Sequence, residues 1–433
     1  MKHIHLLLPG ILALVIHGPS AKADDWPQWR GPTRDGVWHE DGLIDKFSSP
    51  QVKIAWRAEI SSGYSGPTVA GGRVYVTDRI VEPKQFERVH CFDERTGQKI
   101  WTHEYECKYS ISYSAGPRAS VLIDDGRAYA LGAMGNFNCY DAASGKVLWQ
   151  KDLNTEYKIV MQNWGIAASP LVYGDLVIVQ IGGEDACLVA FDKKSGKEAW
   201  HALSDRASYA APLMIEQAGK PVLLCLTGDN VVGLEPTSGS VYWKYPFPPT
   251  KMVIAISTPV VSDRWLFITT FYDGSLMLRL DKDKLGVEKV WRRQGTDERH
   301  TDGLHSIIST PLIQGAYLYG VDSYGELRCL TCESGTRLWE DDRATPHTRW
   351  SNIHMVTNHG KVWMFNERGE LIIAKLSPQG YEEFSRAKLI DPTEEQLRQR
   401  GGVCWSHPAY ANRHIFARND REIVAADLSA GAQ

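Results

Sequence analysis

The sequence lacks the features that mark membrane-spanning proteins, nucleic-acid-binding proteins and several enzyme classes. Beyond residue 23, no apolar run approaches the roughly 18 residues that a membrane-spanning helix needs, so we expect no transmembrane segment there. The formal net charge of −4 provides no basic field for nucleic acid or anionic lipid. No P-loop, dinucleotide fingerprint, GxSxG motif or HExxH motif is present. These absences exclude nucleic acid as a partner and leave no local catalytic signature.

Cysteine is sparse and poorly arranged for metal binding. Of the 8 cysteines, only Cys329 and Cys332 form a CxxC pair, whereas a structural zinc site usually needs a second such pair. We therefore predict no metal site, and we interpret the cysteines mainly as small, buried apolar residues. A local disulfide between Cys329 and Cys332 is the alternative in an oxidising compartment.

The first 23 residues follow the three-part pattern of a secretory signal peptide. Lys2 precedes an apolar run from Leu6 to Ile16, and a small-x-small cleavage site ends at Ala23. The apolar run is too short to cross a bilayer, and no cysteine follows it to carry a lipid anchor. We therefore predict cleavage between Ala23 and Asp24 and export to the periplasm or the extracellular space. An uncleaved membrane anchor is the alternative.

Tryptophan is abundant, and its spacing reveals an internal repeat. Six of the 15 tryptophans end a similar phrase, such as CYDAASGKVLW, in which a strand, an acidic turn and a second strand follow one another. Glycine in the turn can adopt the positive φ that such a hairpin needs. A period of 40–50 residues is typical of propellers and solenoids. The six copies end at Trp101, Trp149, Trp200, Trp243, Trp291 and Trp339, and a degenerate seventh copy ends at Phe384.

A second hairpin precedes each phrase, so that each repeat contains four strands, as in one propeller blade. We predict an all-β fold: a single eight-bladed β-propeller of four-stranded antiparallel blades at residues 52–433, preceded by an extension at residues 24–51. The eighth blade lacks its outer strand, and we expect residues 53–60 to supply it and close the ring.

Residues 392–400 are the best helix candidate, within a loop insertion. The first strands are expected near Pro67, Val121, Pro170, Pro212, Pro259, Pro311, His354 and Pro408.

The repeated phrase resembles the tryptophan-docking motif of propellers built from pyrroloquinoline-quinone (PQQ)-like repeats. The motif, roughly A-x-D-x-x-T-G-x-x-x-W, covers nearly all of residues 52–429. Residues 25–36 (DWPQWRGPTRDG) and 116–132 (GPRASVLIDDGRAYALG) are similar to exported PQQ-like repeat proteins of planctomycete-type bacteria. The wider superfamily includes quinoprotein alcohol dehydrogenases and a scaffold subunit of the outer-membrane protein assembly machine. A shared fold does not show which of these functions a protein has.

The dehydrogenase branch implies a specific set of residues. PQQ enzymes hold a calcium ion with Glu, Asn and Asp side chains, use a carboxylate as the base, and in many cases carry a disulfide between adjacent cysteines. This sequence has no adjacent cysteine pair, and no calcium ligands could be matched. We therefore favour a binding or scaffold role, and a PQQ-dependent dehydrogenase of alcohols or sugars, with PQQ and Ca²⁺, is the alternative.

The mouth of the central channel is the expected binding site. Segments that enter the innermost strands meet at one rim of a propeller, and here they mix aromatic and polar residues. Such a concave surface suits a small polar ligand or an envelope protein partner, while solvated loops and packing between blades are the structural alternative. The candidate residues are Tyr64, Arg118, Trp164, Tyr209, Asp302, His305, Asn352 and Trp405.

Overall fold

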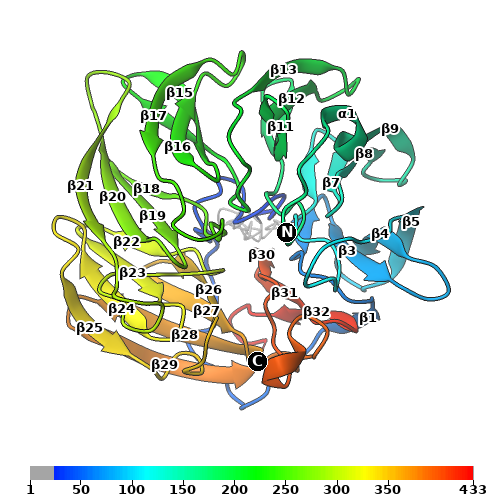
Figure 1. Ribbon diagram of the computed structural model, residues 1–433. Coiled ribbons are helices and arrows are strands. Elements are labelled where there is room, and N and C mark those ends of the chain that lie inside the picture. The colour runs from blue at the N-terminus through cyan, green and yellow to red at the C-terminus, as the bar shows by residue number, and fades with distance from the viewer. Residues whose placement is uncertain (1–23, 433) are drawn as a thin grey trace, which may run out of the picture.

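A computed structural model describes residues 24–432, which form a ring of eight four-stranded antiparallel sheets around a central axis (Figure 1). In each blade the first strand lies beside the axis and the last lies at the circumference. The predicted fold class and the eight first strands are confirmed. The signal peptide predicted at residues 1–23 lies outside the described residues.

The blades follow the order of the chain. Blade I contains β2 (Thr68–Ala70), β3 (Arg73–Ile80), β4 (Phe86–Asp93) and β5 (Lys99–Glu106); blade II, β6 (Leu122–Asp124), β7 (Arg127–Leu131), β8 (Asn136–Asp141) and β9 (Val147–Asp152); blade III, β10 (Leu171–Tyr173), β11 (Leu176–Gly183), β12 (Ala186–Asp192) and β13 (Glu198–Ala202); and blade IV, β14 (Leu213–Gln217), β15 (Lys220–Leu226), β16 (Asn230–Leu234) and β17 (Val241–Pro246).

The second half of the ring continues in the same way. Blade V contains β18 (Val260–Ser262), β19 (Trp265–Thr270), β20 (Gly274–Leu280) and β21 (Val287–Arg293); blade VI, β22 (Leu312–Gln314), β23 (Tyr317–Val321), β24 (Leu327–Thr331) and β25 (Arg337–Asp341); blade VII, β26 (Ile353–Asn358), β27 (Lys361–Asn366), β28 (Glu370–Ser377) and β29 (Gly380–Lys388); and blade VIII, β30 (Ala409–Ala411), β31 (His414–Arg418), β32 (Glu422–Asp427) and β1 (Trp56–Glu59).

The N-terminal strand closes the ring, as the sequence predicts. Strand β1 pairs antiparallel with β32, with Trp56 opposite Ala425 and Glu59 opposite Glu422. Blade VIII therefore combines strands from both ends of the propeller and leaves no unfinished sheet at the seam. Such closure protects the strand edge that would otherwise pair with other chains.

The acidic turn of the repeat is held by its own side chains. In blade II, one carboxylate oxygen of Asp141 accepts hydrogen bonds from the backbone N–H (2.8 Å) and the hydroxyl (2.6 Å) of Ser144. Gly145 follows with a φ of 72°, a conformation that residues with a side chain rarely adopt. The sequence Asp-x-x-Ser-Gly therefore specifies the turn between the third and fourth strands.

The repeat tryptophans join each blade to the next. The ring of Trp101 in blade I lies on Gly145 of blade II, where a Cβ atom would stand 2.6 Å from it. Its indole Nε1–H donates to the carbonyl of Ala142 at 3.1 Å. Glycine is therefore required both for the turn and for the neighbouring ring. Equivalent bonds run from Trp56 to Glu94, Trp149 to Lys193, Trp200 to Pro236, Trp291 to Cys332 and Trp339 to Ser377.

Two junctions depart from this rule. Blade V has a different turn, and the Nε1–H of Trp243 donates to the amide oxygen of Gln217, whose own NH₂ group donates to carbonyls of that turn. Between blades VII and VIII the repeat supplies only Phe384, which is 40% exposed. Near this junction Trp38 and Phe47, from the N-terminal segment, pack against Trp363 of blade VII.

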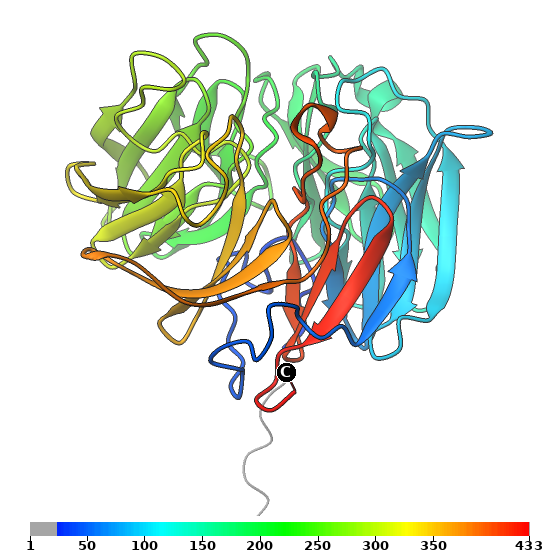
Figure 2. The ribbon, with the colours of Figure 1, turned by 90° about the horizontal axis from the view of Figure 1, so that it is seen from below.

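The segment of residues 24–51 belongs to the propeller and crosses its lower face, where the C-terminal end also lies (Figure 2). It forms isolated bridges to blades I and VII, between Trp26 and Val69 and between Val37 and Thr357. Trp26 is only 2% exposed. This segment therefore contributes to the hydrophobic core.

Helical structure is minimal in residues 24–432: α1 (Leu153–Tyr157) and the 3₁₀ turn η1 (Arg398–Arg400). The helix proposed for residues 392–400 is thus wrong except for its last turn. Polar side chains of this segment bond to distant parts of the chain instead: Thr393 donates to Asp420, and Gln396 donates to the carbonyl of Gly63. These bonds hold the segment as a loop. No helix in this part of the chain is long and apolar enough to cross a membrane.

The eight cysteines, all of them within the described residues, are buried and unpaired. The alternative of a Cys329–Cys332 disulfide is therefore wrong for this structure. Burial raises the pKa of the Cys332 thiol to about 12, so that this group remains a protonated, unreactive thiol at neutral pH.

Candidate functional site

A cavity of about 160 Å³ lies at the centre of the ring, at the mouth of the channel. It is formed by the loops that lead into the innermost strands, and each of the eight loops contributes at least one residue. The lining residues are Tyr64, Tyr113, Arg118, Trp164, Ala167, Ser169, Tyr209, Ala211, Ile256, Ile307, Ile308, Trp350, His354, Trp405 and His407, together with Trp29 from the N-terminal segment.

Aromatic rings form much of the cavity wall. Tyr113 lies between two tryptophans, with ring centroids 6.0 Å from Trp164 and 6.1 Å from Trp350, and both contacts are edge-to-face. Trp164 also contacts Tyr209 at 5.2 Å. These rings support one another across loops of four different blades. They present flat apolar surfaces that suit a planar or ring-shaped ligand.

The N-terminal segment supplies one wall of the cavity at its inner end. Trp29 donates its Nε1–H to the hydroxyl of Thr258 at 2.8 Å, and its ring meets His407 edge-on at 4.4 Å. On the same segment, the guanidinium of Arg34 is buried and donates to the carbonyls of Pro170 and Pro212 in blades III and IV. Because this arginine fastens the segment inside the ring, Trp29 has a fixed position.

The cavity contains one charged lining residue at neutral pH. Burial lowers the pKa of His354 to about 4 and that of His407 to about 3, so both imidazoles are neutral. His354 Nε2 bonds to the Trp405 carbonyl at 2.9 Å, and His407 Nε2 lies 2.7 Å from the hydroxyl of Ser120. No aspartate or glutamate of residues 24–432 lines the cavity. Its charge therefore comes from Arg118.

The structure brings together five of the eight residues singled out from the sequence. Tyr64, Arg118, Trp164, Tyr209 and Trp405 all line the cavity. The other three, Asp302, His305 and Asn352, are not among the lining residues. Whether the five bind a ligand remains a prediction.

The three residues outside the cavity have structural partners. Asp302 is exposed and forms an ion pair with Arg293 at 2.6 Å. Asn352 is fully buried, accepts a hydrogen bond from Ser309 and lies 3.1 Å from Nε2 of His354. Asn352 therefore supports a lining residue without reaching the cavity.

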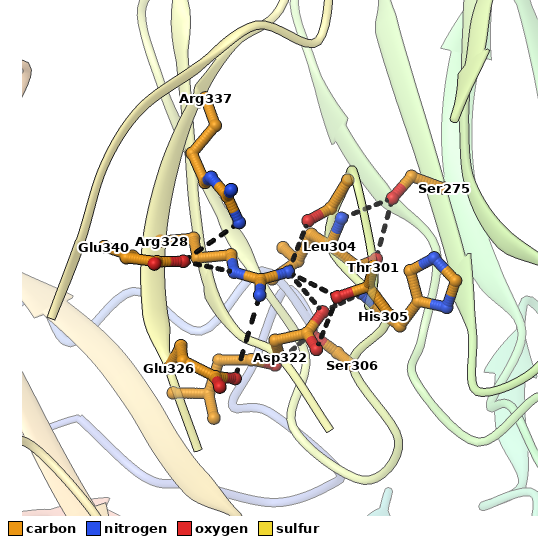
Figure 3. A network of polar contacts seen from close by, with 12 residues as sticks. Ser275, Thr301, Leu304, His305, Ser306, Asp322, Glu326, Arg328, Arg337 and Glu340 are labelled. Atoms are coloured by element: carbon orange, nitrogen blue, oxygen red, sulfur yellow. Dashed lines mark hydrogen bonds and ion pairs between the residues drawn. The ribbon is translucent and has the colours of Figure 1, made fainter. Parts of the chain in front are cut away.

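His305 belongs to a polar network between blades V and VI (Figure 3). Its backbone N–H donates to the Asp322 carboxylate at 2.6 Å, and its Nδ1 lies 3.0 Å from the Phe271 carbonyl. Asp322 also accepts from Thr301 (3.0 Å) and forms an ion pair with Arg328 (2.9 Å). This network fixes the loop that crosses from blade V to blade VI. His305 therefore has a role in packing between blades, the structural alternative to ligand binding.

Several lining residues were missed by the sequence interpretation. Trp350 and His354 lie two residues before and after Asn352, and His407 lies two residues after Trp405, but none of the three was selected. Tyr113, five residues before Arg118, was missed as well. Trp29 was missed because it lies outside the repeats. The only signal for it is the unusual pair of tryptophans in the phrase DWPQWRG.

A larger groove of about 720 Å³ adjoins the cavity and shares Tyr209 with it. Its lining includes the apolar residues Val160, Met161, Met252 and Val253, and Val160 is 84% exposed. Lysines and acidic residues flank these side chains. The mouth is therefore part of a wider surface on which apolar and charged groups are mixed.

The residues of the cavity do not fit a calcium–PQQ site. Calcium takes six to eight oxygen ligands, mostly carboxylates and carbonyls, and the lining residues include no carboxylate. Within residues 24–432, no three or more His, Cys, Asp or Glu side chains converge in a way that could hold a metal ion. The ring-rich walls would accommodate a planar quinone, but the donor set for its metal is missing from this part of the chain.

Comparison with known proteins identifies the family. Residues 85–341, more than half of the chain, match the family model described as outer membrane protein assembly factor BamB. The chain belongs to this BamB-like family of PQQ-repeat β-propellers. The assembly factor BamB of Yersinia pestis is 21% identical over 271 residues, which cover 60% of this chain and 64% of that protein. The chain thus matches less than two thirds of the length of this relative.

Solved structures share the architecture. BamB from Moraxella catarrhalis aligns with a TM-score of 0.61 and 15% identity, covering 87% of this chain and 99% of that chain. Quinohemoprotein alcohol dehydrogenase from Comamonas testosteroni aligns with a TM-score of 0.64 and 13% identity, covering 94% of this chain and 81% of that chain. One is an assembly factor and the other a dehydrogenase, so these similarities establish the fold alone.

Proposed function

We propose that this protein is an exported binding or scaffold protein of the cell envelope and that the cavity at the channel mouth is its binding site. The name of its BamB relatives, outer membrane protein assembly factor, supports a place in the envelope. The signal-like pattern of residues 1–23 supports export. The ligand is a small molecule or a side chain of an envelope protein partner.

One observation carries this proposal: all eight inter-blade loops place residues around one cavity walled by aromatic rings. Packing between blades does not require this arrangement, because the repeat tryptophans and the polar networks already join the blades. Loops held by a rigid scaffold are the usual location of binding residues. The cavity therefore has the form of a recognition site supported by the blades.

Calorimetric titration of the purified protein with ring compounds tests the proposal. We expect saturable binding that is weakened when Trp164 or Trp405 is replaced by alanine, while the folded state persists. Absence of binding by any ring compound at millimolar concentration would contradict a small-molecule role for the cavity. Export has its own test, since mass spectrometry of the exported protein should show Asp24 as its first residue.

A PQQ-dependent dehydrogenase is the second candidate, and it rests on the fold and on the ring-rich walls. PQQ would supply the redox chemistry, and this chain would supply only the stacking surfaces and Arg118. Absorbance spectra of the protein mixed with PQQ, with and without calcium, separate the two proposals. We expect calcium to leave binding unchanged; a calcium-dependent complex that oxidises an alcohol would favour the enzyme.

A further inference from the structure

The charge of Arg118 is not neutralised by an acidic residue. Its guanidinium donates hydrogen bonds to the carbonyl oxygens of Ser112, Tyr113 and Gly116. It forms no ion pair with a carboxylate within residues 24–432. Carbonyl oxygens satisfy hydrogen bonds but do not cancel a full positive charge. The lining of the cavity therefore carries one net positive charge.

Arg118 is also held in a position to meet a ligand. Its guanidinium lies over the ring of Tyr64, 4.9 Å from the centroid, and is 5.9 Å from the centroid of Tyr109. A guanidinium has five N–H groups; three of them donate to carbonyls, and the other two have no acceptor within the described residues. Because the loop carbonyls fix this side chain, little conformational entropy is lost when it binds a ligand.

The N-terminal segment places further positive charge near the part of the cavity that Trp29 lines. Arg34 is 4% exposed, and it contacts carbonyls and the amide oxygen of Gln28 rather than a carboxylate. Arg30 on the same segment is close enough to lower the pKa values of His354 and His407, although burial is the larger cause. Asp35 offsets part of the charge of Arg30. Arg30, Arg34 and Asp35 together therefore carry one positive charge.

Two hydrogen-bond donors in the wall, the indole N–H groups of Trp350 and Trp405, form no hydrogen bond within the described residues. Both groups are buried. A buried donor without a partner is unfavourable, because it has lost its hydrogen bond to water without gaining another. A ligand with an acceptor oxygen would satisfy such a group, whereas an apolar ring alone would not.

We infer that the cavity selects a small ring compound, or a ring-bearing side group, that carries a negative charge, and that Arg118 recognises this charge. The inference rests on the proposed binding function and assigns its ligand class. The rings of Tyr113, Trp164 and Tyr209 enclose the planar part of the ligand, and the carboxylate or equivalent anion lies against Arg118. Cationic rings are disfavoured because Arg118 repels them and the lining residues among residues 24–432 include no acidic side chain.

Three probes that share one ring test this inference: indole-3-acetate, indole and tryptamine, which are anionic, neutral and cationic at pH 7. Each is titrated into the purified protein in a calorimeter. We expect indole-3-acetate to bind at least about tenfold more tightly than indole, because a charge-assisted hydrogen bond is stronger than a neutral one. Tryptamine should bind most weakly of the three.

Variants of two arginines connect the preference to Arg118. Arg118→Met should reduce the affinity for indole-3-acetate by about tenfold or more and leave that for indole nearly unchanged, while Arg118→Lys retains part of the preference. Arg349→Met is the matched control, because the Arg349 guanidinium also lies over a lining ring, 4.4 Å from the centroid of Trp350, but is paired with Glu298 at 2.7 Å. This control should keep the preference.

The outcomes separate the inference from the proposed function. If indole binds as tightly as indole-3-acetate, the charge selection is wrong and the binding function remains. If none of the three probes binds, the proposed small-molecule function is wrong, and the charge selection that rests on it is wrong too. If Arg118→Met loses indole as well and melts at a much lower temperature, Arg118 serves to hold its loop, and the inference is overturned.

Discussion

The outer and inner tryptophans of this propeller lie in different surroundings. At the circumference, the ring of Trp200 is 7% exposed, lies on Gly239 of the next blade and donates its N–H to the Pro236 carbonyl. At the channel mouth, Trp164 and Trp350 contact other rings and border an open cavity. Most outer tryptophans donate to a carbonyl of the next blade, whereas the rings of Trp164 and Trp350 border the cavity.

Deletion of residues 24–60 should reduce stability more than any other change, because it removes both an outer and an inner tryptophan. It removes an outer tryptophan, Trp56, which docks on Gly97, and the inner Trp29 together with strand β1. The exposed edge of β32 and the loss of core side chains should make the product insoluble or strongly lower its melting temperature. Light scattering and a thermal melt provide the measurement. A truncated protein as stable as the full chain would refute closure by β1.

Replacement of one outer tryptophan should come next in size. Trp200→Ala removes a large buried ring and leaves the Pro236 carbonyl without its donor, and the expected loss in the free energy of unfolding is about 3–5 kcal/mol. Denaturant titration measures it. An unchanged midpoint would show that the repeat tryptophans do not join the blades.

Replacement of Arg34 tests the fastening of the N-terminal segment. Arg34→Met keeps much of the side-chain volume but leaves carbonyls of blades III and IV without their donor. Buried acceptors without partners should lower the free energy of unfolding by about 1–3 kcal/mol. Because Trp29 lies on the same segment, ring binding should weaken too. A variant that is less stable yet binds normally would show that Trp29 is held by other contacts.

Acid should act on the inner ring through its buried histidines. The pKa of His407 is about 3 in the folded state and about 6.5 in an unfolded chain, so the unfolded state takes up a proton first as pH falls below 6.5. Each pH unit between about 6.5 and 4 should therefore reduce the free energy of unfolding by about 1.4 kcal/mol from this residue. Comparison of unfolding at pH 7 and pH 5.5 should show a flatter dependence for His407→Gln. An identical dependence would contradict this origin.

The sequence predicts the outer ring better than the inner one, for a physical reason. The turn, the glycine and the docking tryptophan lie within one short repeated phrase, so local spacing reveals them and the number of blades. The cavity depends on loops that are distant in sequence. His305 is a polar residue on a loop that lines the cavity. Its backbone N–H, however, donates to Asp322 of the next blade, and its side chain is not part of the lining. Trp29 reaches the cavity from outside every repeat, and no local pattern places it there.

The most direct test of the account measures stability and binding together in Trp200→Ala and Trp164→Ala. The account predicts that Trp200→Ala loses about 3–5 kcal/mol of folding free energy. At a temperature where that variant is folded, its affinity for indole-3-acetate should be unchanged. Trp164→Ala should lose about 1 kcal/mol or less but bind indole-3-acetate at least about tenfold more weakly. Equal losses of stability in the two variants, with binding unaffected in Trp164→Ala, would contradict the division between a structural outer ring and a binding inner ring.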